Sequence, residues 1–450
     1  MRCLILPCET RVREFDAKLL LGLVAAARGV AAIVGSKKAI DLNLARYPDG
    51  VYIGKSVTAR SRHNLALARS CGHRVALWDE EGLVWASREV YWRTKVDPAT
   101  LNAPELLIAW GEDNARAWRE HPDYRDTTIA VAGNPRADLL RPELAALFDE
   151  EVNAIAQRHG RFVLINTNFS RVNHLQPRQN RHLKWLREKR PDDPRGGFAA
   201  HKFRLFNAFL EMIPALATRL PEVRFVIRPH PSEDSAVWDR MAADLNNVDV
   251  NRSGNVVAWL LAADGLVHNG CTTAVEAFLL GRPALAYRPV RSADYDHPLP
   301  NDLSLSADSA DELVELVAAA NQSREALFQR QSHGGAGQVM ACAVAGSEGG
   351  ASCSSRILDA LTALIEMPDP PPGYRPRLSQ LVLGLRRGFR HLEHRLPGTA
   401  NYRPYLEHMF PPVSLAEVQR RLGQMATCLG FEERYRVSDL GQSVFRITPS

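Results

Sequence analysis

Three carboxylates follow one another in LWDEEGLVW, residues 77–85, directly after an apolar run that predicts a buried strand. Gly82 comes next and lets the backbone turn tightly, so that at least one carboxylate can face a cleft. Adjacent carboxylates raise one another's pKa, because ionising one makes ionising the next costlier. A raised pKa suits a general base that removes a proton from a hydroxyl near neutral pH. Glu80 and Glu81 are therefore the candidate bases, and Asp79 is a candidate for orienting the loop.

A single histidine lies between two prolines in RPHP, residues 228–231, at the end of the strand-like run VRFVI. The prolines restrict the backbone on both sides and hold the imidazole of His230 in one direction. A histidine held in this way can hydrogen-bond a phosphate oxygen and help a nucleotide leave, with Arg228 beside it as a cation. A histidine that only stabilises a rigid turn is the alternative.

A loop of small residues leads into a predicted helix in HNGCTTAVEA, residues 268–277. Its backbone N–H groups, the hydroxyls of Thr272 and Thr273 and the helix dipole form a phosphate site that needs no lysine. Asn269 and Gly270 precede this site. Glu276, about one turn into the helix, can reach a ribose hydroxyl or a neighbouring loop. An ordinary threonine cap is the alternative.

Two further groups of polar residues lie where predicted strands end, and they are candidates for binding the substrates in a cleft. The first group follows the first strand and the second lies between the two predicted domains: Glu9, Arg11, Arg13, Glu14 and Asp16, and then Asn134, Arg136, Asn166 and Asn168. A solvated helix start with mutual ion pairs is the alternative for the first group. Fixing a hinge is the alternative for the second.

Short apolar strands that alternate with helices must position these groups. Apolar runs such as RCLILP and HRVALW recur through the first 135 residues, and a second series begins with RFVLINTN. Strands that are apolar throughout predict parallel sheets covered by helices on both faces. Ligands bind such sheets at the carboxyl ends of the strands, where the polar clusters lie. We therefore predict an α/β fold with two Rossmann-like domains facing across a cleft.

Three regions are expected, namely two Rossmann-like domains and a helical C-terminal extension, at residues 1–155, 156–367 and 368–450. The extension begins with a proline-rich linker. An amphipathic helix over 378–396 then packs on the body of the protein or lies on a membrane surface. A capping box, Ser414-x-x-Glu417, opens another helix.

Two other segments of the chain bear on organisation. The charged insert REKRPDDPRGG, residues 187–197, is expected to be a lid or an acceptor-binding loop. The apolar stretch 19–36 approaches the length of a membrane span, but Arg28 and Gly29 divide it. A glycine after a basic residue is typical of a helix end, so we predict a buried helix and a buried strand.

Composition excludes several classes of protein. The net charge is only +5 and the arginines are scattered, whereas nucleic-acid-binding proteins concentrate basic residues in one stripe. Seven cysteines without a CxxC pair indicate reduced thiols in a cytoplasmic protein. The chain has no P-loop, GxGxxG, HExxH or GxSxG motif, and no isolated DxD where a metal-dependent nucleotide-sugar enzyme would carry one. These absences disfavour ATPases, dehydrogenases, metallopeptidases and α/β-hydrolases, and neither a metal nor a cofactor is expected.

The pattern of domains and motifs resembles the GT-B glycosyltransferases. Bacterial sialyltransferases and related enzymes that use CMP-activated acidic sugars carry a D/E-D/E-G motif in the first domain. They carry an HP motif in the second, and several have a paired Ser/Thr motif after it. This sequence has Glu80-Glu81-Gly82, His230-Pro231 and Thr272-Thr273 in the same order.

Most of residues 1–365 also resemble the bacterial surface carbohydrate biosynthesis protein family. The likeness is carried by stretches such as ETRVREFDAKLLL, WDEEGLV, GNPRADLLRPEL and HNGCTTAVEAFLLGRPALAY. The Kdo transferases of capsule and O-antigen synthesis are similar, but less closely. The resemblance implies that a carboxylate of the acidic motif, Glu80 before Glu81, is the base for the acceptor hydroxyl. It also implies that His230 and the paired threonines hold the CMP phosphate.

The expected function is therefore transfer of Kdo or a related nonulosonic acid from a CMP-sugar to a surface glycan or lipid-linked glycan. Peripheral association with the inner membrane is expected. Three alternatives remain: the same fold with a UDP-sugar or CDP-glycerol donor, an epimerase acting on UDP-N-acetylhexosamine without an acceptor, and a non-catalytic glycan-binding subunit. The motifs do not distinguish inversion from retention at the anomeric carbon.

Overall fold

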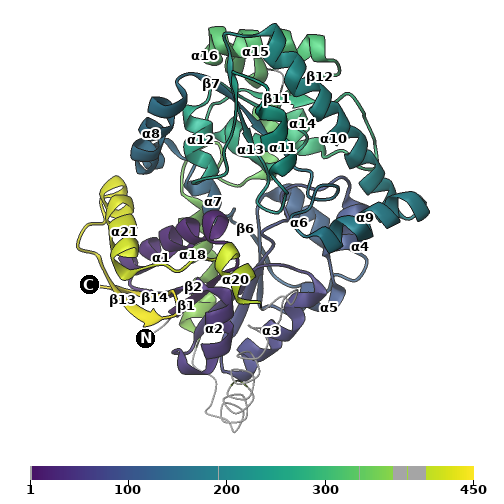
Figure 1. Ribbon diagram of the computed structural model, residues 1–450. Coiled ribbons are helices and arrows are strands. Elements are labelled where there is room, and N and C mark those ends of the chain that lie inside the picture. Colours follow the sequence, from purple (N-terminus) through teal and green to yellow (C-terminus); the bar gives the residue numbers. More distant parts are fainter. Residues whose placement is uncertain (1–2, 191, 334, 368–382, 384–401) are drawn as a thin grey trace. The chain divides into compact units, whose positions relative to one another are not determined.

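The computed structural model describes residues 3–190, 192–333, 335–367, 383 and 402–450 (Figure 1). Contacts divide the chain into two compact units. Unit 1 comprises Met1–Leu83, Glu89–Leu147 and Ala341–Ser450, and unit 2 comprises Val84–Arg88 and Phe148–Met340. The linker and the amphipathic helix predicted over 378–396 lie outside the described residues, apart from Leu383, which is buried.

Unit 1 is built on an eight-stranded sheet in the order β13-β14-β2-β1-β3-β4-β5-β6. Strands β1 to β6 of this sheet run parallel to one another. The strands are β1 (Cys3–Cys8), β2 (Ala31–Ser36), β3 (Gly50–Gly54), β4 (Arg74–Trp78), β5 (Leu106–Ala109), β6 (Ile129–Val131), β13 (Tyr435–Gly441) and β14 (Val444–Pro449).

The helices of unit 1 connect these strands or follow them in the chain. They are a π-helical turn η1 (Arg11–Phe15), α1 (Asp16–Ala27), α2 (Lys37–Asn43), η2 (Leu44–Arg46), α3 (Ala59–Ser70), α4 (Arg88–Lys95), α5 (Pro98–Leu101), α6 (Glu112–Arg119), α7 (Pro135–Asp138), η3 (Pro142–Phe148), α18 (Cys353–Glu366), α20 (Arg403–Met409) and α21 (Leu415–Leu429). Helix α1 and strand β2 account for the apolar stretch 19–36, as predicted. No helix among the described residues has the length and apolarity needed to cross a membrane.

Unit 2 is built on a six-stranded parallel sheet in the order β12-β11-β10-β7-β8-β9. The strands are β7 (Phe162–Asn166), β8 (Arg224–Arg228), β9 (Val248–Val250), β10 (Gly265–His268), β11 (Ala284–Tyr287) and β12 (Leu305–Ala307). The helices are α8 (Asp149–His159), α9 (Pro177–Lys189), α10 (Pro194–Arg219), α11 (Ala236–Ala242), α12 (Val256–Ala262), α13 (Thr272–Leu279), α14 (Pro298–Asp302), α15 (Ala310–Gln322) and α16 (Arg324–Ser332). Helix α17 (Ala336–Ala343) spans the point at which the chain passes back to unit 1.

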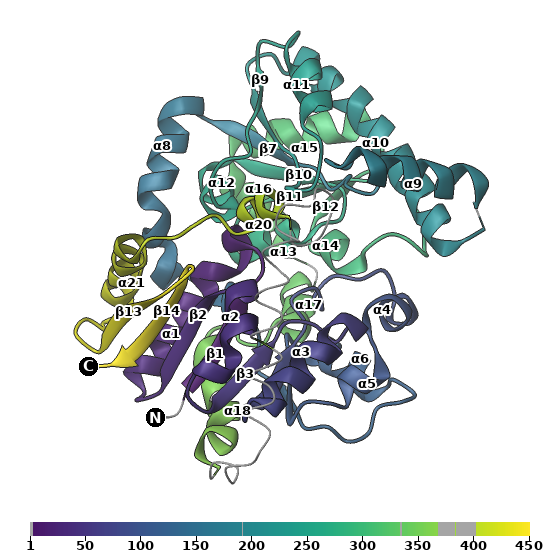
Figure 2. The same cartoon turned by 60° about the horizontal axis from the view of Figure 1, so that its bottom comes forward.

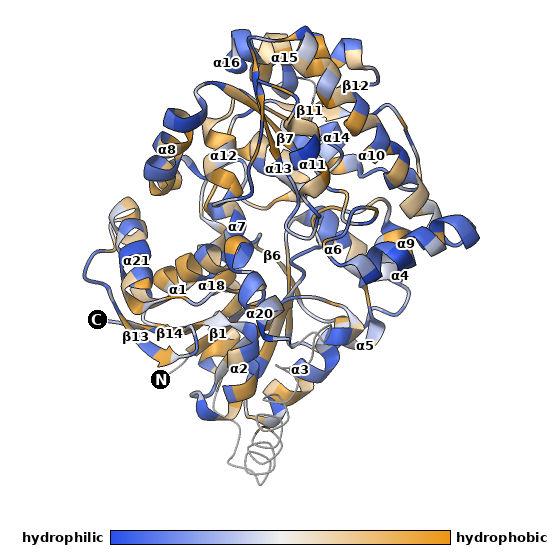
Figure 3. Ribbon diagram, viewed as in Figure 1, coloured by the Kyte–Doolittle hydropathy of each residue, from blue (hydrophilic) through white to orange (hydrophobic). Residues whose placement is uncertain are grey.

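The apolar strands are buried on both faces, as the sequence predicts. Every residue of β1 and β7 is buried, and the strands are mostly apolar in Figure 3. In unit 2, Val163 and Ile165 of β7 pack into one hydrophobic cluster, and Phe162 and Leu164 pack into another. Alternate residues of a strand point to opposite faces, so a separate apolar core covers each face. The α/β fold class with two parallel sheets is confirmed.

The segment from Ala341 to Glu366, which we expected in the second domain, belongs to unit 1. The carboxylate of Asp138 accepts hydrogen bonds from the backbone N–H groups of Cys353 and Ser354, each 2.7 Å long, and from the Ser354 hydroxyl, also at 2.7 Å. These donors lie at the N-terminus of α18, where a carboxylate is favourable. The segment NPRAD, residues 134–138, thus holds the start of α18 on unit 1 through the carboxylate of Asp138.

The C-terminal extension is only partly helical. Helix α21 begins as predicted, with the Ser414 hydroxyl accepting a hydrogen bond from the backbone N–H of Glu417. Residues 435–449 instead form a hairpin, whose strand β14 pairs antiparallel with β2 and extends the first sheet (Figure 2). Gln442 and Ser443 both have positive φ, 55° and 57°, which is typical of a tight hairpin turn. The prediction of a wholly helical extension was wrong for this segment.

Candidate functional site

The candidate base Glu80 is buried at the carboxyl end of β4, with only 6% of its surface exposed. Its Oε1 atom accepts a hydrogen bond from Trp78 Nε1 at 3.0 Å and lies 3.0 Å from Lys18 Nζ. The other oxygen, Oε2, is buried and has no hydrogen-bond partner. One oxygen of the carboxylate is therefore fixed, and the other has its hydrogen-bonding capacity unused.

Lys18 of α1 is the centre of a buried ionic cluster. Its ammonium group donates to Pro7 O at 2.8 Å and to Glu14 Oε2 at 2.8 Å, besides its contact with Glu80. Glu14 also accepts hydrogen bonds from the backbone N–H groups of Glu9 and Thr10. Burial alone would raise the pKa of Glu14, but Lys18 and Lys55 lower it to about 2. The cluster therefore holds Glu14 ionised at neutral pH.

The three carboxylates of the acidic loop occupy different environments, so mutual repulsion is not what governs them. Asp79 is fully buried, and burial raises its pKa to about 6, while Tyr91 donates a hydrogen bond to it at 2.9 Å. The side chain of Glu81 is half exposed and lies 3.0 Å from Arg13. Burial raises the pKa of Glu81, but the cations Arg13, Lys95 and Arg136 outweigh it and lower the pKa. A lowered pKa weakens Glu81 as a base.

The first predicted substrate-binding group is divided among several partners. Arg11 pairs with Glu417 of α21, and Asp16 accepts a hydrogen bond from Arg421 of the same helix at 2.8 Å. Glu9 pairs with Lys55. Arg11 and Asp16 thus hold the C-terminal helix on unit 1, and the structure favours a scaffolding role for both.

Asn134 and Arg136 lie at the start of α7. Asn134 Oδ1 caps the helix by accepting a hydrogen bond from the Arg136 N–H at 3.0 Å, while its Nδ2 is buried without a partner. The guanidinium of Arg136 lies over the Trp110 ring, with 5.8 Å to the ring centroid. Their predicted role in binding ligand stays a prediction.

In unit 2, the RPHP loop is held by a residue that the sequence analysis did not single out. Glu233 is fully buried, and its carboxylate accepts hydrogen bonds from Thr167 Oγ1, from Phe169 N at 2.7 Å and from Trp238 Nε1 at 3.1 Å. It ties the loop after β8 to the loop after β7, which follows Asn166, the last residue of β7, and contains Asn168. Asn166 Oδ1 is buried without a hydrogen-bond partner, whereas Asn168 is partly exposed.

The imidazole of His230 is oriented by its own loop. Its Nδ1 atom accepts a hydrogen bond from the Ser232 N–H at 3.1 Å, which places the proton of the neutral ring on Nε2. Nε2 is then a donor, as hydrogen bonding to a phosphate requires. Arg228 donates to the carbonyl oxygens of Ser253 and Gly254 at 2.6 and 3.0 Å. Arg228 therefore positions a neighbouring loop in this structure.

The predicted phosphate loop enters α13 at Thr272. Cys271 is the N-cap residue, and its side chain makes no hydrogen bond to the helix amides. Instead its Sγ lies 2.6 Å from Thr273 Oγ1. Both threonines and Glu276 are partly exposed. The N–H of Ala274 donates to Cys271 O at 3.1 Å, so the amides of Thr272 and Thr273 are the candidates for binding an outside acceptor, as in anion-binding helix ends.

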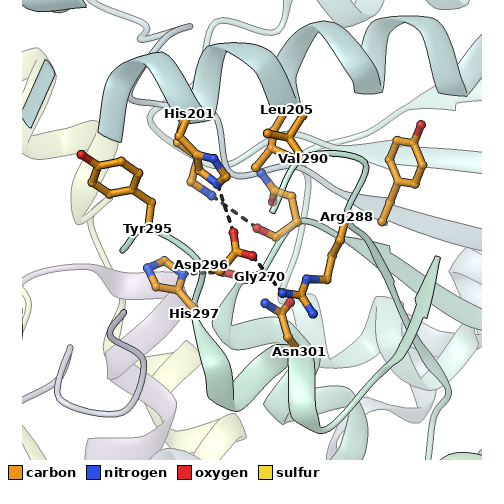
Figure 4. Close-up of a pocket in the computed structure, with 12 residues that line it drawn as sticks. His201, Leu205, Gly270, Arg288, Val290, Tyr295, Asp296, His297 and Asn301 are labelled. Atoms are coloured by element: carbon orange, nitrogen blue, oxygen red, sulfur yellow. Dashed lines mark hydrogen bonds and ion pairs between the residues drawn. The ribbon is translucent and has the colours of Figure 1, made fainter. Parts of the chain in front are cut away.

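Next to this loop lies a pocket that includes a buried lysine (Figure 4). Lys202 of α10 is 3% exposed and donates to Asn269 O at 3.3 Å. Burial lowers the pKa of Lys202 to about 8. Among the described residues, no carboxylate forms an ion pair with it. The prediction that the phosphate site needs no lysine therefore missed a cation beside the loop.

Several polar atoms around Lys202 are buried without hydrogen-bond partners. They are Asn269 Nδ2 and Oδ1, Asn301 Oδ1, His201 Nδ1 and Arg288 Nε. Buried polar groups are nearly always hydrogen-bonded, and the hollow among these residues holds about 10 Å³, the room of about one water molecule or one ligand oxygen. The hydrogen bonds of this cluster are therefore completed only by a water molecule or a ligand oxygen in the hollow.

The remaining contacts in the pocket are ion pairs and a hydrogen bond that fix the residues lining it. Asp296 pairs with His201 at 3.1 Å and with Arg288 at 2.8 Å (Figure 4). The distance between His297 Nδ1 and Gly270 O is 2.8 Å. Burial, together with the positive charge of Lys202, lowers the pKa of His297 to about 4. At neutral pH His297 is therefore uncharged, and Lys202 supplies the positive charge. Among the described residues, no group of three or more His, Cys, Asp or Glu side chains forms a metal-binding cluster.

No model of a known protein family and no curated protein matches this sequence. Solved structures do match the fold. A presumed UDP-N-acetylglucosamine 2-epimerase from Listeria monocytogenes has a TM-score of 0.50 and 12% identity, covering 82% of this chain and 97% of its own. The Neisseria meningitidis UDP-GlcNAc 2-epimerase bound to UDP-GlcNAc has a TM-score of 0.49 and 13% identity over 81% of this chain and 100% of its own. Anabaena HepE in complex with UDP-glucose has a TM-score of 0.43 and 12% identity over 82% of this chain and 100% of its own. At these identities the likeness shows the fold alone.

Proposed function

We propose that this protein is a sugar-nucleotide enzyme of the GT-B fold class, with its nucleotide bound in unit 2, which transfers the sugar to a glycan or lipid-linked glycan. The observation that carries the proposal is the buried ammonium of Lys202 beside Asn269 and the start of α13. A buried charge without a counter-charge is costly. A phosphate or carboxylate oxygen in the hollow pairs with Lys202 and satisfies the amide of Asn269.

The donor is the finer part of the proposal, and two classes fit. UDP-sugars come first, because the name of the Listeria protein, whose fold is similar, contains UDP-N-acetylglucosamine. CMP-activated acidic sugars come second, on the order of the three short motifs. Both classes place two negative charges near the anomeric carbon, as two phosphates or as one phosphate and one carboxylate. Either would match the lysine, the donor face of His230 and the amides of α13.

Glu80 is the proposed base for the acceptor hydroxyl. Its Oε2 atom has no hydrogen-bond partner, and Lys18 and Trp78 hold the other oxygen. General-base catalysis needs a carboxylate that is fixed and able to accept a proton. Glu81, whose pKa is lowered, is the second choice.

A nucleotide screen tests the proposal. We expect UDP or CMP, at about 100 times its Kd, to stabilise the folded protein by about 2.7 kcal/mol and to raise the Tm by about 3 °C. Guanosine and adenosine monophosphates serve as controls and are expected to shift the Tm far less. The absence of a shift with every pyrimidine nucleotide would contradict the proposal.

A turnover assay on the donor selected by the screen separates the alternatives. Nucleotide release that depends on an added glycan acceptor supports transfer. Conversion of a UDP-sugar to its epimer without an acceptor, seen by proton NMR, would identify an epimerase instead. Binding without turnover of any sugar nucleotide would identify a non-catalytic subunit.

A further inference from the structure

Helix α9 is the most basic short segment of unit 2. From Arg178 to Arg190 it carries six lysines and arginines against a single carboxylate, in the sequence RQNRHLKWLREKR. Glu188 pairs only loosely, at 4.0 Å from Lys184 and 3.5 Å from Arg187. Among the residues that the structure describes, Arg178 and Arg181 form no ion pair. The segment therefore keeps most of its positive charge.

An aromatic side chain lies among these cations on the outer face of the helix. Leu183 and Leu186 are buried and define the inner face, whereas 48% of the Trp185 surface is exposed. Arg181, Lys184 and Lys189 are exposed as well, and Figure 3 shows α9 mainly as a hydrophilic helix. Leu175, just before the helix, is also exposed, at 46%. Large apolar side chains with this much exposure are few among the described residues, so two of them within eleven residues is notable.

The helix is anchored to the candidate site. The backbone N–H of Leu175 donates to Ser232 O at 2.8 Å, and Asn173 Nδ2 donates to Asp234 O at 2.8 Å. The segment that leads into α9 is thus bonded to the loop that carries His230. A partner held by α9 would lie next to that loop.

We propose that the exposed face of α9 docks on a membrane surface rich in anionic phospholipid. A tryptophan favours the interface between headgroups and hydrocarbon, and each lysine or arginine near an anionic surface strengthens binding by about fivefold. Leu175 and Trp185 supply the apolar contact, and the cations around them supply the attraction. The inference does not depend on which sugar nucleotide is bound.

Vesicle flotation of the full-length protein tests this inference. With vesicles of about 30% phosphatidylglycerol in phosphatidylcholine, we expect binding that is at least about tenfold stronger than to pure phosphatidylcholine and that weakens at high salt. The double variant Arg181→Glu/Lys184→Glu is expected to lose at least about tenfold of that binding. The matched control, Arg158→Glu/Arg330→Glu, makes the same change in charge at exposed positions on α8 and α16.

Fluorescence shows whether Trp185 itself enters the interface. The difference in emission between the wild type and Trp185→Phe is expected to shift to the blue when anionic vesicles are added. Equal loss in the control double variant, equal binding to neutral vesicles, or no shift would each overturn the proposal. Binding of α9 to an anionic polysaccharide but not to vesicles would also overturn it, in favour of a glycan-binding surface.

Discussion

Replacing Glu80 with glutamine is expected to lower kcat/KM for sugar transfer by roughly 100- to 10,000-fold, the range for loss of a general base. Glutamine keeps the shape of the side chain and can still accept the hydrogen bond from Trp78 Nε1, but it cannot take a proton from an acceptor hydroxyl. Lys18 retains Glu14 as a partner at 2.8 Å, so the variant is expected to fold. Initial rates with the donor and acceptor identified by turnover measure the effect.

Glu81→Gln is the matched control, because it makes the same chemical change one residue away. The Glu81 side chain is half exposed and paired with Arg13, so we expect its loss to change kcat/KM by no more than about threefold. The Kd of the donor nucleotide should be the same in both variants, since the proposed nucleotide site lies in unit 2. Full activity of Glu80→Gln would refute its assignment as the base, and an inactive Glu81→Gln would transfer that role to Glu81.

Replacing Lys18 with methionine is expected to lower the free energy of unfolding by about 3–5 kcal/mol, the usual effect of removing one partner from a buried ion pair. The substitution leaves Glu14 and Glu80 without the cation that contacts both. Lys184→Met is the control, because its ion pair is exposed and 4.0 Å long, and it should cost less than about 1 kcal/mol. Urea unfolding at pH 7 measures both.

The dependence on pH gives Lys18→Met a second signature. In the wild type the pKa of Glu14 is lowered to about 2, so its stabilising contribution is present above its ordinary pKa and is lost as the pH falls towards 2. Without Lys18 the carboxylate of Glu14 is more easily protonated. The deficit of the variant should therefore shrink between pH 7 and pH 4. A deficit that stays constant over that range would show that lost packing, rather than lost charge, causes it.

The sequence predicts the framework of the site better than its contents. Apolar strands require cover on both faces, so two parallel sheets follow from runs such as RCLILP and RFVLINTN. The polar motifs come directly after those runs, and the structure accordingly places DEEG after β4, RPHP after β8 and HNGCTT after β10. The local sequence pattern is sufficient to place these motifs, because the end of a strand and the loop after it are adjacent in the chain.

The buried charges depend on contacts that are distant in the chain, and this is why they were missed. Lys202 resembles a surface lysine, and only its helical spacing from Leu205 and Phe209, which are buried, signals an inward position. Lys18 reaches Glu80, 62 positions along the chain, only after β1 and β4 are assembled in one sheet with β3 between them. The terminal hairpin had a local signal, the alternation of apolar and polar residues in YRVS, residues 435–438, which a helical interpretation of the extension ignored.

The central claim is that Lys202 binds the nucleotide. Its most direct test is to measure the Kd of the nucleotide by calorimetry at several pH values from 7 to 9.5, for the wild type, Lys202→Met and Arg204→Met. Arg204 lies on the same helix but is exposed, so it controls for loss of a cation. Because the pKa of Lys202 is about 8, we expect the wild-type Kd to be constant below pH 8 and to rise by up to about tenfold per pH unit above it. Lys202→Met should bind roughly 10- to 100-fold more weakly at pH 7, with no such rise, and Arg204→Met should match the wild type. Equal Kd values and equal pH profiles for the wild type and Lys202→Met would contradict a nucleotide site at Lys202.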